Sequence, residues 1–197
     1  NVINELKPSI IGGYNSANFD WHWIFERCRI LGIDPKKICK SLHPQHSFTR
    51  KDGMLKLANE VETYTQTSIW GYNVIDIIHA VRRAQAINSS IKAAGLKYIT
   101  KYINAESPSR VYIDHDNIGK MFLNKEEYWL NTQNGNYKKA NNPAYDNLDT
   151  KFPNVYKKIT GDKIVEMYLD DDLDETLKVD QEFNQGSFLL AAMIPTT

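Results

Sequence analysis

The clearest pattern of apolar and polar positions runs from a short apolar stretch into an amphipathic segment near the start of the chain. Residues 8–13 (PSIIGG) place two isoleucines between a proline and two glycines, which predicts a buried parallel strand that ends in a tight turn. Apolar side chains then recur at helical spacing, at Trp21, Ile24, Phe25, Cys28 and Leu31. Gly32 is of the type that ends helices, so the pattern predicts a strand, a turn and a helix that begins at Asp20.

Asp20 stands where the predicted turn becomes the predicted helix. A carboxylate at the carboxyl end of a strand in an α/β sheet lies where such folds bind ligands. An aspartate at the start of a helix is also a common N-cap residue. This stretch alone leaves both interpretations open.

Later segments predict further strands and helices. Residues 55–69 alternate between apolar and polar positions and are rich in Thr and Tyr, which favours a hairpin, and residues 72–76 favour another strand. A helix follows Asp76, where an N-cap role is favoured over contact with a substrate. Residues 131–147 are rich in Asn, Tyr and Lys without periodicity, which predicts an inserted loop.

Composition describes an ordinary globular protein. The chain has 197 residues, of which 42% are hydrophobic and 24% charged, so we expect one domain over residues 1–197. No run approaches the roughly 20 apolar residues that cross a bilayer, and we expect no membrane partner. Cys28 and Cys39 show neither disulfide nor metal-ligand spacing, and His43 and His46 lack the partners that a zinc site needs.

Charge is balanced overall but unevenly distributed. There are 24 Lys and Arg and 24 Asp and Glu residues, which is not the basic excess of a general nucleic-acid coat protein. Basic residues crowd positions 27–56, whereas acidic residues crowd positions 162–182. A basic surface near an acidic pocket suits a phosphate backbone that approaches metal ions. Two solvated helix faces of opposite sign would give the same pattern.

Two motifs resemble those of one enzyme family. Asn15-x-x-x-Phe19-Asp20 resembles the Exo II motif of the 3′-5′ exonuclease (proofreading) domain of family B DNA polymerases. Tyr168-Leu169-Asp170-Asp171-Asp172 resembles their Exo III motif, Tyr-x-x-x-Asp. The order and separation of the motifs fit the family, and residues 70–76 and 95–99 resemble its intervening strand and helix segments. The resemblance covers nearly the whole chain, and we hypothesise a phage-like member.

The resemblance implies a fold and a set of site residues. The fold would be α/β, a ribonuclease H-like mixed sheet with flanking helices. Asp20 and Asp172 would be catalytic carboxylates that bind two Mg²⁺ or Mn²⁺ ions, and the Tyr168 hydroxyl would orient the attacking water. Asn15 would hydrogen-bond near the terminal nucleotide and Phe19 would stack on its base, although a core aromatic is the alternative for Phe19.

The neighbours of the second motif are also acidic. They are Asp170, Asp171, Asp174 and Glu175, which point elsewhere around the predicted helix. We expect them to be solvated, although Asp171, three residues after Tyr168, is also placed to approach the rim of the pocket.

The Exo I motif, Asp-x-Glu on a strand, has no equivalent upstream of Asp20. The literal match at residues 180–182 lies in a predicted helix, where positions i and i+2 point about 200° apart. We therefore expect the N-terminal strands of the fold to be missing and this chain alone to be nearly inactive. The strand at Ile10 would then be a bare edge, or pair with an unexpected segment or with another molecule, and the fragment would tend to self-associate.

The leading hypothesis is the 3′-5′ exonuclease domain of a family B DNA polymerase, a DNA-binding hydrolase of DNA replication. Its partners would be a single-stranded or frayed 3′ end of DNA and the polymerase domain of the same parent chain, which residues 184–197 would begin to reach. The expected location is the cytoplasm of a bacterium or a phage-infected cell. The alternatives are a non-catalytic module that binds single-stranded DNA or has a structural role, and a free-standing DNA exonuclease.

Overall fold

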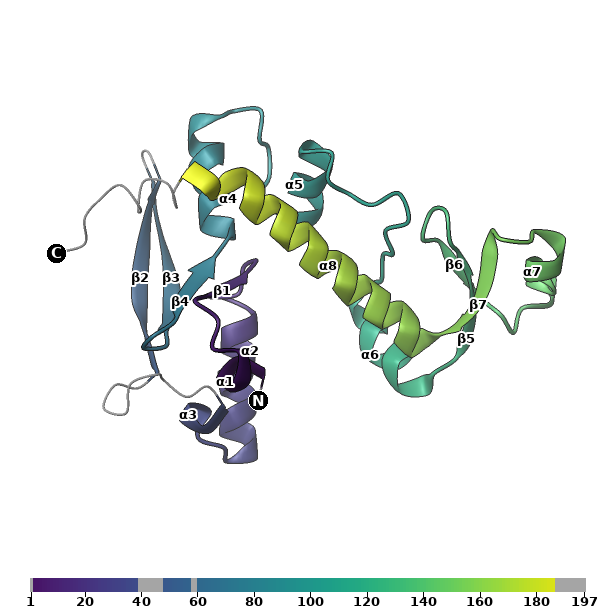
Figure 1. Ribbon diagram of the computed structural model, residues 1–197, viewed down its shortest axis with the longest axis horizontal. Helices are drawn as coiled ribbons and strands as arrows, with labels where there is room; N and C mark the ends of the chain where they lie inside the picture. The colour runs from purple at the N-terminus through teal and green to yellow at the C-terminus, as the bar shows by residue number, and fades with distance from the viewer. Residues whose placement is uncertain (1, 39–47, 58–59, 187–197) are drawn as a thin grey trace. The chain divides into compact units, whose positions relative to one another are not determined.

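The computed structural model describes residues 2–38, 48–57 and 60–186 (Figure 1). Cys39, His43 and His46 lie outside the described residues, as does most of the expected connection at 184–197. The described chain forms two compact units. Unit 1 comprises Asn1–Ile99 and Val179–Thr197, and unit 2 comprises Thr100–Lys178. Each unit is described by itself, and the single domain expected over residues 1–197 stays a prediction.

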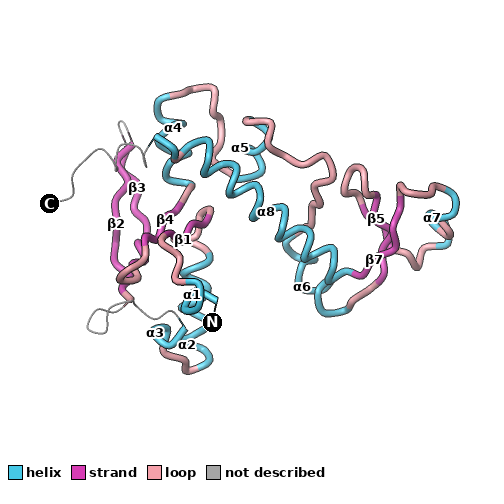
Figure 2. The backbone as a smooth tube through the Cα atoms, viewed as in Figure 1, coloured by secondary structure: helices cyan, strands magenta, loops and turns pink. Residues whose placement is uncertain are grey.

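Unit 1 contains two small sheets. Its elements are α1 (Val2–Leu6), β1 (Ile10–Gly13), α2 (Asp20–Leu31), α3 (Pro35–Ile38), β2 (Thr49–Leu57), β3 (Glu60–Ser68), β4 (Asn73–Asp76) and α4 (Ile78–Ile87). Strands β1 and β4 are parallel, and their register runs from Ile10 opposite Asn73 to Gly13 opposite Asp76. Strands β2 and β3 form a long antiparallel hairpin, visible as the paired strands of Figure 2. A hairpin is therefore present, as is the strand after it, but the hairpin begins at Thr49, six residues before the predicted start at Leu55.

The predicted strand, turn and helix at the start of the chain are also present. Helix α2 begins at Asp20 and ends at Gly32, which adopts the left-handed conformation with φ 64° and donates its N–H to the Arg29 carbonyl. Trp21 of this helix packs into a core cluster with Phe48, Ile69 and Tyr72. The apolar side chains on one face of α2 thus hold the helix against this core cluster.

The prediction that β1 is a buried strand is wrong in one respect. Ile10 is 44% exposed and Ile11 only partly buried. Within the described part of the chain, β1 belongs to a two-stranded sheet and pairs with β4 alone. Its other edge therefore has no strand partner among the described residues, which explains the exposure of Ile10.

Unit 2 is built around a three-stranded antiparallel sheet. Its elements are α6 (His115–Asn124), β5 (Glu127–Asn131), β6 (Tyr137–Lys139), the 3₁₀ helix η1 (Pro143–Tyr145), α7 (Leu148–Lys151) and β7 (Tyr156–Thr160). The strand order is β6-β5-β7, so β5 is the central strand. Tyr128 and Leu130 of β5 pack against Ile164 and Tyr168 in the core of this unit.

The segment expected to be an inserted loop, residues 131–147, contains β6 and η1. That expectation is wrong because β6 forms by pairing with β5, with Trp129 opposite Lys138. Three residues are too short to show a period of two, so the local sequence carries no strand signal.

Two helices cross the boundary between the units along the chain. Helix α5 (Leu96–Tyr102) and helix α8 (Gly161–Phe183) each begin in one unit and end in the other. Residues 180–182 fall within α8, so their Asp-x-Glu sequence is helical as expected. The described residues are thus a mixed α/β arrangement of small sheets and helices. None of the described helices is long and apolar enough to span a membrane.

Candidate functional site

The turn at residues 14–19 joins β1 to α2 in unit 1 and carries the first predicted motif. Asp76, at the end of β4, accepts hydrogen bonds from the backbone N–H groups of Asn15 and Ala17, each at 2.8 Å. Asn15 has a left-handed backbone with φ 57°, which an asparagine tolerates better than most residues. The carboxylate of one strand therefore fixes the turn that follows its neighbouring strand.

Asp76 also serves the helix that follows it. Its Oδ1 accepts a 3.3 Å hydrogen bond from the Ile78 N–H, at the start of α4. The N-cap position of α4 belongs to Ile77, so the N-cap role favoured for Asp76 is wrong by one residue, although Asp76 still accepts a hydrogen bond from the first turn of the helix. The local sequence did not reveal its bonds to the 14–19 turn. Burial raises the pKa of Asp76, while its hydrogen bonds to Ala17, Ile78 and Asn15 and the nearby His79 oppose the rise.

Phe19 and Asp20 are adjacent at the end of this turn. Phe19 is 66% exposed, so it is not a core aromatic. Asp20 is exposed in the first turn of α2, while the N-cap position belongs to Phe19 without a side-chain hydrogen bond. Partial burial raises the pKa of Asp20, its own backbone N–H opposes the rise, and the negative charge of Asp76 adds to it. Two carboxylates therefore interact electrostatically beside the turn.

A small cavity of about 50 Å³ lies behind the turn in unit 1. Ser16, Asp76 and His79 contribute to its lining, and the rings of His79 and Tyr64 meet edge to face at 4.2 Å. Burial lowers the pKa of His79, which the Asp76 charge opposes. This volume is of the order of one or two waters and is too small for a nucleotide.

The second predicted motif lies on α8 in unit 2. Tyr168 is 5% exposed, and its hydroxyl is hydrogen-bonded to the Asp172 carboxylate one helical turn later. Burial raises the pKa of Tyr168, and the charge and hydrogen bond of Asp172 raise it further. The shared helical face expected for these two residues is therefore present. The side chain of Asp172 is 29% exposed.

A buried arginine, which the sequence analysis did not single out, contacts the same motif. The side chain of Arg110 is 2% exposed and forms an ion pair with Asp172, and its Nε lies 2.9 Å from Glu175 Oε1. Its guanidinium carbon lies 5.1 Å from the centre of the Tyr168 ring. We call Arg110, Asp171, Asp172 and Glu175 the Arg110 cluster. The run of acidic residues from Asp170 to Glu175 is the sequence signal of this cluster, and nothing in the local sequence marks Arg110 as buried.

The acidic neighbours of Asp172 are not all solvated, which corrects that expectation. Glu175 is 2% exposed because it faces Arg110 inside unit 2. Asp171 accepts a 3.0 Å hydrogen bond from the Val111 N–H, so it anchors the segment that carries Arg110. Asp174, by contrast, is exposed as predicted.

Asp20 belongs to unit 1 and Asp172 to unit 2, so their predicted sharing of a metal ion stays a prediction. Among the described residues, no group of three or more His, Cys, Asp or Glu side chains is arranged to hold a metal ion. Each of the two carboxylates nevertheless suits one position of a magnesium or manganese site. Both offer hard oxygen donors with exposed surface, and a cation beside Asp20 would offset its repulsion with Asp76.

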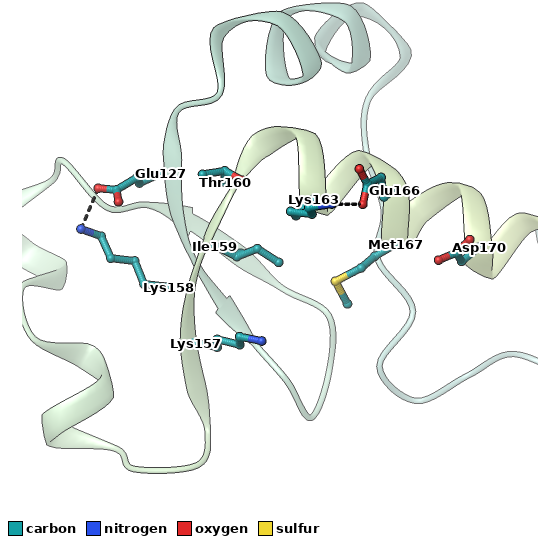
Figure 3. A pocket seen from close by; sticks show the side chains of 9 residues that line it. All are labelled: Glu127, Lys157, Lys158, Ile159, Thr160, Lys163, Glu166, Met167 and Asp170. Atoms are coloured by element: carbon teal, nitrogen blue, oxygen red, sulfur yellow. Dashed lines mark hydrogen bonds and ion pairs between the residues drawn. The ribbon is translucent and has the colours of Figure 1, made fainter.

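A cavity in unit 2 lies between β7 and the start of α8 and has a volume of about 570 Å³ (Figure 3). Its lysines are largely neutralised: Lys158 pairs with Glu127 at 2.6 Å, and Lys163 pairs with Glu166 at 2.5 Å. Asp170 lines the same cavity and balances Lys157. This balance selects neither anions nor cations, so we assign no ligand to it.

A comparison of the sequence with protein families matches the part of the chain that contains the first motif, residues 15–20. Unit 1 is a mixed α/β unit in which a turn after a parallel strand leads to Asp20, and this arrangement is compatible with an exonuclease domain. The family model "DNA polymerase family B, exonuclease domain" matches residues 1–99, just over half of the chain. The chain belongs to this family.

Among curated proteins, DNA polymerase 2 of Aeropyrum pernix is 37% identical over 43 residues. The match covers 22% of this chain and 5% of that polymerase, so the chain spans only a small part of its relative. No solved structure matches the chain.

Proposed function

We propose that this chain is the 3′-5′ exonuclease domain of a family B DNA polymerase and removes mispaired 3′ nucleotides by phosphodiester hydrolysis. The observation that carries the proposal is the 14–19 turn. Asp76 fixes its backbone, and Phe19 and Asp20 are exposed at its end, after a parallel strand. The family match includes this turn. The proposal extends to a ribonuclease H-like fold and to a polymerase domain in the same parent chain.

Each residue has a proposed role. Exposed Phe19 stacks on the last base of a single-stranded or frayed 3′ end, and Asn15 hydrogen-bonds beside it. Asp20 and Asp172 would hold the divalent ions, which supply an activated hydroxide and stabilise the leaving 3′ oxygen when bound. Tyr168 holds the Asp172 carboxylate through its hydroxyl and faces the attacking water.

Two carboxylates are too few to hold two divalent ions firmly, because Mg²⁺ and Mn²⁺ sites of this kind rest on several acidic oxygens. We therefore propose that the 197 residues alone hydrolyse DNA slowly, and that further carboxylates complete the site in the natural protein. Magnesium as the physiological ion and the proofreading role are parts of the same proposal.

The test uses the natural full-length protein and a 5′-labelled single-stranded oligonucleotide in Mg²⁺. Shortening from the 3′ end is expected, with a loss of about a hundredfold or more in Asp20→Ala and Asp172→Ala, since each removes several kcal/mol of transition-state stabilisation. Asp174→Ala changes an exposed acid on the same helix and should keep the wild-type rate. Wild-type activity in Asp20→Ala would refute the proposal.

A second candidate is a non-catalytic module that binds single-stranded DNA. The pairing of Asp172 with Arg110 favours it, because a carboxylate that already has a cationic partner gains less from a metal ion. Binding of single-stranded DNA that depends on Phe19, without hydrolysis in Mg²⁺ or Mn²⁺, would support this candidate over the first.

A further inference from the structure

Arg110 is buried together with acidic partners that lie on one face of α8. Its side chain is 2% exposed and that of Glu175 is 3% exposed. A buried guanidinium is costly to desolvate unless its donors are paired. Besides Glu175, Arg110 contacts Asp172, whose side chain is 29% exposed. The buried guanidinium therefore reaches a carboxylate that is partly open to solvent.

The guanidinium is held by hydrogen bonds from NH1 and NH2 and by an ion-pair contact of Nε that lacks hydrogen-bond geometry. Nε lies 2.9 Å from Glu175 Oε1, and NH1 donates to the Val111 carbonyl at 3.0 Å. NH2 donates to Asp172 Oδ1. The guanidinium also lies over the ring of Tyr168, with 5.1 Å from its central carbon to the ring centre. The planar fork of an arginine meets several acceptors in fixed directions, which the single ammonium of a lysine cannot do.

Asp172 is therefore held from two sides. Tyr168 bonds its carboxylate from one turn earlier on α8, and Arg110 bonds it from the segment before α6. Asp171 accepts the Val111 N–H at 3.0 Å and so ties the Arg110 segment to the helix. These contacts restrict the rotamer of Asp172 while leaving the side chain partly exposed.

We infer that Arg110 is a positioning residue for the exonuclease site, which fixes the Asp172 carboxylate from its buried side in the orientation that a divalent ion requires. The inference rests on the proposed function. Carboxylates that bind metal ions are commonly held by a second hydrogen-bond partner, whose loss weakens activity about 10- to 100-fold.

The first readout is kinetic and uses the natural full-length protein. Arg110→Gln should lower kcat for 3′ hydrolysis about tenfold or more and leave KM for DNA within about twofold, because it disturbs a ligand and not the DNA contacts. Arg110→Lys restores the charge without the fork and should recover part of kcat. Asp174→Asn is the matched control on α8 and should equal wild type.

The second readout is Mn²⁺ binding, followed by electron paramagnetic resonance without DNA. Loss of the contact that orients Asp172 should weaken Mn²⁺ binding about tenfold in Arg110→Gln. A structural role alone would reduce the folded fraction and leave the dissociation constant of the folded protein unchanged. Unchanged or tighter Mn²⁺ binding by the folded variant would therefore overturn the inference.

The outcomes separate this inference from the proposed function. If Asp172→Ala abolishes hydrolysis but Arg110→Gln does not, the inference fails and the function stands. If wild type hydrolyses no DNA, the proposed function fails, and the inference that rests on it fails as well. If Arg110→Gln does not fold, Arg110→Gln/Glu175→Gln removes one buried charge of each sign. That double variant should then show the low kcat and weaker Mn²⁺ binding, and wild-type values would overturn the inference.

Discussion

The carboxylate of Asp76 accepts the backbone N–H of Ala17 at 2.8 Å, across 59 residues of sequence. Its other oxygen accepts the N–H of Asn15 at the same distance. The end of β4 thereby determines the backbone of the turn that presents Phe19 and Asp20. The position of the candidate site residues in unit 1 thus depends on a half-buried carboxylate at the end of the neighbouring strand.

Replacement of Asp76 should loosen this turn. Asp76→Ala removes the acceptor for three backbone N–H groups, and we expect a loss of about 2–4 kcal/mol in the free energy of unfolding. Asp76→Asn keeps one acceptor oxygen and should cost less. Urea unfolding measures the loss, and faster amide hydrogen exchange at Asn15 and Ala17 locates it. Asp52→Ala, an exposed acid on β2, should stay within about 0.5 kcal/mol of wild type. Unchanged exchange in Asp76→Ala would contradict this role.

Phe19 should matter for DNA and not for folding. Because its side chain is 66% exposed, Phe19→Ala should change the free energy of unfolding by no more than about 0.5 kcal/mol. Loss of a base stack should weaken binding of single-stranded DNA by about 1–3 kcal/mol, measured by fluorescence anisotropy. Phe122→Ala removes a 49% exposed phenylalanine from unit 2 and serves as the control. Equal affinity for DNA in Phe19→Ala and wild type would exclude stacking.

Local sequence signals predicted the elements that depend on near neighbours. The strand at Ile10, the turn and the helix that begins at Asp20 follow from a proline, glycines and an apolar stripe, all within 25 residues. The helical face shared by Tyr168 and Asp172 follows from a spacing of four residues. These parts of the candidate site were predictable because their geometry is set by the helix itself.

The remaining features depend on residues far apart in the chain. Arg110 meets Asp172 across 62 residues, and no periodicity in the sequence marks an arginine as buried. Glu175 was expected to be solvated because acidic side chains usually are, and its ion pair with Arg110 overrides that rule. Strand β6 was missed for a similar reason, since its hydrogen bonds come from β5 and not from its own three residues.

The ionisation of Glu175 should make stability depend on pH. Burial raises the pKa of Glu175 from its ordinary 4.5 to about 7, although Arg110 opposes the rise. The folded state therefore holds the proton more tightly than the unfolded state. The stability that this provides is complete below pH 4.5 and is lost as the pH rises through 7, by about 3 kcal/mol. Urea unfolding of wild type and Glu175→Gln from pH 4 to 8 isolates the contribution. Parallel pH dependence in the two proteins would contradict it.

The backbone around Arg110 leaves no room for a side chain at Gly135. Gly135 has φ 69°, a conformation that costs an alanine about 1–2 kcal/mol, and a Cβ there would lie 2.2 Å from the Arg110 carbonyl oxygen. The contact is with backbone, which cannot rotate away, so Gly135→Ala should lose more than about 2 kcal/mol of the free energy of unfolding. Gly119→Ala is the matched control. Nothing lies within 4 Å of its added Cβ in α6, so it should gain about 0.5–1 kcal/mol.

Because the clash would displace the Arg110 backbone, Gly135→Ala should also disturb the Arg110 cluster. We expect faster hydrogen exchange at the Val111 N–H, which donates to Asp171 at 3.0 Å in the native protein. Urea unfolding and exchange at Val111 together make the check, because a loss of stability confined to the 131–135 turn would leave Val111 protected. If Gly135→Ala is destabilised but the Val111 N–H stays protected from exchange, the 131–135 turn has moved to relieve the clash and the Arg110 cluster has kept its structure. Both measurements at wild-type values would mean that the close approach of Gly135 to Arg110 is absent in solution.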